Sequence, residues 1–211
     1  MFKYLRHSIL GYIKTHIVAY FFLFLIFIIG IVIGALAVKT LPDEQKSELI
    51  SYLRLFFQGL TSDGGAYNTM TIFQSALYSN VKAIGFIWLL GLTVIGLPIV
   101  FFIVFTRGFI IGFTVGFLVN EYFVKGLAFA LVSVLPHNFI AVPALITASV
   151  AAVTFSRHIV KASQKKVGFI QQSLQYTLLC TLCCLFIILA SLIETMISPV
   201  FMKMVAAIFI K

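Results

Sequence analysis

The segment 133–144, SVLPHNFIAVPA, is the part of the sequence whose residue types could do chemistry. His137 lies inside the long uncharged run 126–156 and could relay a proton or bind a metal ion, given acidic or histidine neighbours. Glu121 and Glu194 are the acids closest to the apolar segments, and an intramembrane enzyme using His137 with either is one hypothesis. The favoured interpretation is a lone histidine that satisfies backbone groups.

Two prolines in the same segment predict an interruption of the helix. Proline lacks a backbone donor and disfavours helical geometry in the residue before it. His137 and Asn138 could bond to the carbonyls that the prolines leave without a partner. We therefore predict a helix break at Pro136, His137, Asn138 and Pro143 that faces the bundle interior or lies at the outer surface.

No catalytic, metal or cofactor motif accompanies these residues. The sequence has no Ser-His-Asp set, no H-E-x-x-H, no P-loop and no suitably placed carboxylate pair. Cys180, Cys183 and Cys184 include a C-x-x-C spacing, but they lie within an apolar run and are interpreted as packing residues. We expect no catalytic residue, no metal site, no cofactor and no enzyme activity.

The composition excludes a soluble domain. Apolar residues make up 62% of the chain and charged residues 10%, whereas a soluble domain has roughly 25% charged residues. Uncharged runs at 15–38, 83–106, 126–156 and 167–193 each exceed the ~20 residues that span a bilayer as a helix. The sequence predicts an all-α, polytopic helical membrane protein, a single domain over 1–211 with about five transmembrane helices plus amphipathic interfacial helices.

Basic residues set the predicted topology. The net charge of +9 is interpreted as a signal that holds loops at the cytoplasmic face and not as a nucleic-acid site. The residues predicted to lie inside are Lys3, Arg6, Lys14, Arg107, Arg157, Lys161, Lys165 and Lys166. The expected helices are 16–38, 82–105, 108–130, 137–156 and 169–196, with the N-terminus cytoplasmic and the C-terminus extracytoplasmic. Residues 1–16 form a cytoplasmic interfacial segment, and the first apolar run is too long for a cleaved signal peptide.

Glycine spacing predicts where helices pack closely. Small residues four apart lie on one helix face and allow two backbones to approach in a membrane. The expected packing positions are Gly30, Gly34, Gly91, Gly96, Gly108, Gly112 and Gly116. The strict series at 108, 112 and 116 is the strongest of these signals.

The segment 39–82 is the only long polar one and is predicted to be an extracytoplasmic loop before a four-helix hydrophobic block, 83–196. Its residues 41–60 have helical spacing of apolar side chains. This amphipathic helix either lies on the bilayer or docks a partner. The candidate docking residues are Lys46, Leu49, Leu53, Arg54, Phe56, Phe57 and Leu60.

Three stretches carry a family resemblance. GLPIV at 96–100, RGFIIGFTVGF at 107–117 and SVLPHNFIAVPA at 133–144 resemble the stage II sporulation protein M family. The wider family often has P-H-G-x-x-E-x-P-A, which Pro136, His137, Pro143 and Ala144 match. Asn138 replaces the glycine and Ala141 the glutamate. A chemical role of that glutamate would thus be absent here.

The resemblance implies a membrane scaffold of endospore-forming bacteria. It would localise peptidoglycan-degrading partners, stage II sporulation proteins D and P, at the sporulation septum during engulfment of the forespore. Its expected place is the cell membrane on the mother-cell side, in contact with the lipid bilayer and with no nucleic acid. The alternative is a transporter or channel, for which a homodimer could supply the pore.

Overall fold

The computed structural model describes residues 11–61, 69–93, 95–162 and 169–209, and these ranges are helical apart from short connections. A helical segment at 11–15 comes first. The elements that follow are α2 (Ile17–Ala37), the 3₁₀ turn η1 (Val38–Thr40), α3 (Asp43–Thr61), α4 (Thr69–Gly91), α5 (Gly96–Ala162) and α6 (Phe169–Phe209). The described ranges contain no strand, which confirms the all-α prediction. Lys3, Arg6, Lys165 and Lys166 lie outside them.

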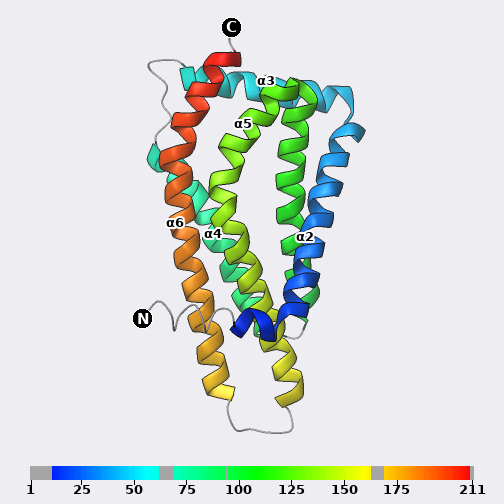
Figure 1. Ribbon diagram of the computed structural model, residues 1–211, viewed down its shortest axis with the longest axis vertical. Helices are drawn as coiled ribbons and strands as arrows, with labels where there is room; N and C mark the ends of the chain where they lie inside the picture. The colour runs from blue at the N-terminus through cyan, green and yellow to red at the C-terminus, as the bar shows by residue number, and fades with distance from the viewer. Residues whose placement is uncertain (1–10, 62–68, 94, 163–168, 210–211) are drawn as a thin grey trace.

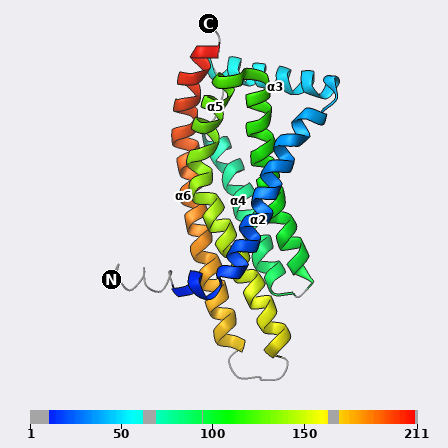
Figure 2. The same cartoon turned by 45° about the vertical axis from the view of Figure 1, so that its right-hand side comes forward.

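The long helices run side by side along the long axis, and α3 lies across one end (Figures 1 and 2). We call this the α3 end. The opposite end, the hairpin end, consists of residues 11–16, 154–162 and 169–179. There the last turns of α5 and the first turns of α6 extend past the segment 11–15 (Figure 1).

Apolar side chains cover the outside of the bundle, as they do on a protein surrounded by lipid. Phe102, Phe139 and Leu174 expose 65%, 80% and 65% of their surface. Stretches long and apolar enough to cross a membrane occur at Ile17–Thr40, Gly96–Ile159 and Ile170–Leu192, with a shorter apolar helix at Leu77–Gly91. These helices fit a membrane location. The predicted count of about five crossings stays a prediction.

Helix α5 folds back on itself at Phe123, not at the predicted break. Phe123 has φ 50° and ψ −127°, the only non-helical geometry within α5, and it divides the element into a first arm, 96–122, and a second arm, 124–162. Its neighbours Asn120, Glu121 and Lys125 are polar, so the reversal places them at the α3 end instead of inside the bundle.

The predicted break at Pro136 and Pro143 is therefore wrong. Both prolines lie inside the second arm, which stays helical around them. Asn138 donates through Nδ2 to Val134 O, 2.8 Å away, while His137 Nδ1 lies 3.3 Å from Ala190 O on α6. Helix α6 packs against this arm at His137, and neighbouring helices and polar side chains allow proline within a membrane helix.

Phe123→Gly should stabilise the protein by about 1 kcal/mol, because glycine adopts a positive φ without the steric cost that phenylalanine bears. The Phe123 side chain is 76% exposed, so its removal costs little packing. Thermal unfolding in detergent measures the change. Val124→Gly is the matched control, since this exposed neighbour has helical geometry and should lose stability. Equal losses in both variants would contradict the prediction.

The boundary between α4 and α5 also differs from the prediction of one helix over 82–105. Helix α4 ends at Gly91 and α5 starts at Gly96, with Gly96 N bonded to Thr93 O at 3.3 Å. Pro98 then occupies the first turn of α5, a position where its missing N–H costs nothing. Arg107 consequently lies near the middle of the first arm, not in a cytoplasmic loop.

The glycines of α2 and α5 pack against each other. A Cβ at Gly30 or Gly34 would strike the backbone of Phe109, at 3.0 Å from its N and 2.9 Å from its C, respectively. A Cβ at Gly116 would lie 2.9 Å from Ala35 Cα, and Gly108 and Gly112 face the backbone of α2 in the same way. The two predicted glycine series therefore lie in one interface.

The second arm of α5 is the central rod of the bundle. Most of its residues between 144 and 156 are buried, many of them alanine, serine or valine. Gly91 of α4 lies against it, since a Cβ there would be 2.8 Å from Ala152 Cβ, whereas Gly96 faces its own turn at Leu90. Within the uncharged run 126–156, residues 144–156 are thus mostly covered by other helices.

Candidate functional site

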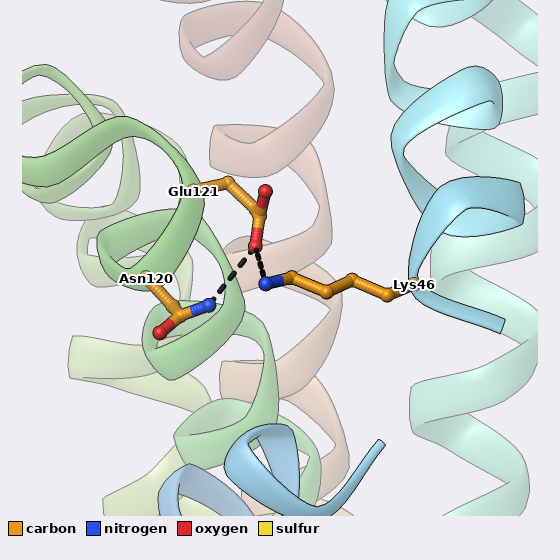
Figure 3. Close-up of polar contacts among 3 residues, drawn as sticks. All are labelled: Lys46, Asn120 and Glu121. Carbon is orange, nitrogen blue, oxygen red and sulfur yellow. Dashed lines mark hydrogen bonds and ion pairs between the residues drawn. The ribbon is translucent and has the colours of Figure 1, made fainter. Parts of the chain in front are cut away.

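An ion pair fixes α3 across the end of the bundle. Lys46 Nζ lies 2.8 Å from Glu121 Oε1, and Asn120 Nδ2 donates to the same oxygen at 2.9 Å (Figure 3). The side chains of Lys46 and Glu121 are 33% and 15% exposed, so the pair is partly shielded from solvent. The reversal at Phe123 places Glu121 next to α3, so the Lys46–Glu121 ion pair depends on this reversal of α5.

The predicted docking residues of α3 mostly lie on the face that packs against the bundle, not on its exposed face. Lys46, Leu49, Ile50 and Leu53 are half-buried, a helical spacing that turns them towards the bundle. Of the predicted docking residues with described side chains, only Arg54 is exposed; the side chains of Phe56, Phe57 and Leu60 lie outside the description. The outward face carries Glu44, Glu48, Tyr52 and Leu55 instead.

A second polar cluster lies at the mid-level of the bundle. Arg107 of α5 donates to Asn80 Oδ1 of α4, and Asn80 Nδ2 donates to Ser191 Oγ of α6 at 3.4 Å. Asn80 is 3% exposed and Ser191 fully buried. Polar groups at this depth cost free energy unless they are paired, and they commonly mark functional positions in membrane proteins. The cluster links three helices.

A pocket of about 230 Å³ adjoins this cluster. Its polar lining comes from both arms of α5 and from α4: Ser79, Asn80, Arg107, Thr114, Ser133, His137 and Asn138. The sequence singled out His137 and Asn138 but not Asn80, and it placed Arg107 in a loop. One sequence signal indicated that Arg107 lies within a helix: apolar residues flank it on both sides, at 97–105 and 108–119.

The structure tests one of the two proposed catalytic pairs, His137 with Glu121. Glu121 lies at the turn with Lys46, while His137 lies about 20 Å further along the second arm at 1.5 Å per residue. The structure therefore does not bring these two together. Glu194 falls well inside α6, which continues past the predicted end at Met196, and its side chain lies outside the description. Cys180 and Cys183 are buried in the apolar core, in line with a packing role.

Comparison of the sequence with protein-family models identifies the family of this chain. The family model described as stage II sporulation protein M matches residues 23–199. This chain belongs to the stage II sporulation protein M family. Comparisons with curated proteins and with solved structures gave no significant match.

Family membership makes the chain a sporulation-related membrane protein. The matched region begins inside α2 and ends inside α6, so it includes the glycine interface, the α3 ion pair and the mid-level polar cluster. This family is not a known enzyme family. The segment 11–16 precedes the match.

Proposed function

We propose that this protein is a membrane scaffold that holds peptidoglycan-degrading partners, stage II sporulation proteins D and P, at the sporulation septum during engulfment. Membership in the family supports the setting. The observation that carries the proposal is α3, an amphipathic helix fixed across the end of the bundle by the Lys46–Glu121 pair at 2.8 Å. A helix held flat in this way offers a fixed surface to proteins outside the membrane.

The distribution of charge supports an orientation with the hairpin end in the cytoplasm. The α3 end carries Lys39, Lys46, Arg54 and Lys125 beside Asp43, Glu44, Glu48 and Glu121, so its described charges balance. The hairpin end carries Lys14 and Arg157 with no described carboxylate, and the adjoining sequence adds Lys3, Arg6, Lys165 and Lys166. Basic residues favour the cytoplasmic side. The α3 end would then face the wall that the partners degrade.

The outward face of α3 has the composition of a binding surface. Tyr52 and Leu55 expose 62% and 64% of their surface beside the acidic Glu44 and Glu48. Aromatic residues are enriched at protein interfaces, and surrounding acids favour a basic partner surface. We therefore place the docking surface on this face, opposite to the half-buried leucines.

Charge reversal at the ion pair tests the proposal. Lys46→Glu should place two acids together, release α3 and reduce co-purification of the two partners from sporulating cells. Loss of the pair should cost about 1 kcal/mol of α3 attachment. The swap Lys46→Glu with Glu121→Lys should restore recruitment, because the pair re-forms with opposite polarity.

Tyr52→Asp is the matched variant on the outward face. It should reduce recruitment without releasing α3, which protease protection of residues 43–55 can monitor. Unchanged recovery of both partners in Lys46→Glu and in Tyr52→Asp would contradict the scaffold proposal.

A transporter or channel remains the second candidate, favoured by the polar pocket at mid-level around Arg107. Vesicles that contain the purified protein would show flux of ions or wall precursors if it is correct. Flux that Asn138→Leu abolishes would favour this candidate over the scaffold. No flux across the panel would exclude it.

A further inference from the structure

Two adjoining pockets at the hairpin end share a pair of histidines. One, about 200 Å³, lies between the start of α2 and the end of α5, and the other, about 370 Å³, lies between α5 and α6. His16, Thr154 and His158 line both. A water molecule occupies about 30 Å³ in the liquid, so the smaller pocket has room for a group of several heavy atoms.

Positive charge and hydrogen-bond donors surround the smaller pocket. Arg157 lines it together with His16 and His158, while the hydroxyl groups of Thr15 and Thr154 donate to Gly11 O and Val150 O. No carboxylate lines either pocket in the described part of the chain. A guanidinium group beside imidazole donors is the chemistry that binds phosphate oxygens.

The groups that face the histidine pair come from each element around it. Tyr12 lies on the segment 11–15, Arg157 on α5, and α6 contributes Tyr176 with the uncharged Gln172 and Gln175. Burial lowers the pKa of His16 below its ordinary value, and the nearby His158 lowers it further. A bound anion would favour protonated imidazole, so its affinity should fall as the pH rises.

The apolar part of the smaller pocket indicates the source of the phosphate. Val18 and Ala19 line it beside the polar groups, and Val18 is 63% exposed on the outer surface of α2. The membrane-spanning stretch begins at Ile17. The pocket therefore opens where the polar and apolar parts of a lipid would meet the protein.

We propose that His16, Arg157 and His158 form a binding site for an anionic phosphate group, supplied by the headgroup of a membrane lipid or by a soluble phosphate ester. The amphiphilic lining favours the lipid. This inference does not depend on the scaffold function. The phosphate-binding site would hold the hairpin end at membrane regions rich in anionic lipid.

The test measures binding to the purified full-length protein in neutral detergent by isothermal titration calorimetry. The probes are dioctanoyl phosphatidylglycerol, zwitterionic dioctanoyl phosphatidylcholine and inorganic phosphate. We expect phosphatidylglycerol to bind more tightly than phosphatidylcholine. Arg157→Gln should weaken that binding about tenfold, the loss of one charge-assisted hydrogen bond. Tighter binding of inorganic phosphate than of phosphatidylglycerol would assign the site to a soluble ester and support the phosphate chemistry.

Lys14→Gln is the matched control, since it removes a positive charge at the same end without lining either pocket. It should leave affinity within about twofold. Equal losses in Arg157→Gln and Lys14→Gln would show diffuse surface attraction and overturn the proposal, as would equal affinity for the two lipids. His16→Gln should flatten the decline in affinity as the pH rises through the pKa of His16, and an unaltered decline would also count against the site.

Discussion

Gly112→Leu should lower the free energy of unfolding by about 3 kcal/mol or more, the upper range for overpacking. A Cβ at this position would strike the carbonyl oxygen of Ile31 and lie 2.7 Å from its carbonyl carbon. The obstacle is backbone, which cannot move to another rotamer. Helices α2 and α5 would have to separate along their shared interface.

The geometry at these glycines explains why the cost is high. A Cβ at Gly30, Gly108 or Gly112 would meet a carbonyl oxygen of the facing helix, so a glycine hydrogen points at that oxygen now. Such Cα–H···O contacts are worth about 0.5–1 kcal/mol each. In lipid, where apolar burial gives no net drive between helices, close packing and these contacts hold the pair together.

Unfolding in detergent, followed by circular dichroism across a denaturant series, measures the effect of Gly112→Leu. Gly85→Leu is the control, because a Cβ at Gly85 meets nothing within 4 Å and leucine favours the helix. Gly112→Leu with Ile31→Ala should remain unstable, since trimming the Ile31 side chain leaves its carbonyl in place. Wild-type stability of Gly112→Leu would refute the interface.

The glycine interface shows what the sequence could predict. Spacing of four residues puts Gly108, Gly112 and Gly116 on one face whatever the rest of the chain does, and the same local periodicity indicated α3. That this face meets Gly30 and Gly34 depends on contacts between residues far apart in the chain. Periodicity carries no information about such pairing.

The positions of the helix ends were harder to predict. Proline gives a clear local signal, yet Pro136 and Pro143 lie in a continuous helix, since a membrane helix tolerates proline where neighbouring helices and polar side chains satisfy the freed backbone groups. The chain reverses at Phe123, a residue type that rarely adopts positive φ, so no local preference identifies it. Because the turns lie elsewhere than predicted, Arg107 lies at the mid-level of the bundle and not at the predicted cytoplasmic surface.

Asn80→Leu should destabilise the protein by about 3 kcal/mol, because Arg107 loses an acceptor at the mid-level of the bundle. Leucine has the same number and branching of side-chain heavy atoms as asparagine, so the change removes hydrogen bonds without opening a cavity. Ser191 would lose the Nδ2 donor at the same time. Thermal unfolding in detergent and the amount of protein in the membrane both report the loss.

Two variants separate the charge from the neutral part of this network. Ser191→Ala removes the long 3.4 Å contact with Asn80 and should cost less than about 1 kcal/mol. Ser79→Leu adds the same side chain at the exposed neighbouring position and should be tolerated. If Asn80→Leu costs no more than Ser191→Ala, the Arg107 contact contributes little, and the cluster cannot be what ties α4 to α5 at this depth. A large loss confined to Asn80→Leu would make the guanidinium of Arg107 the group around which three helices are arranged.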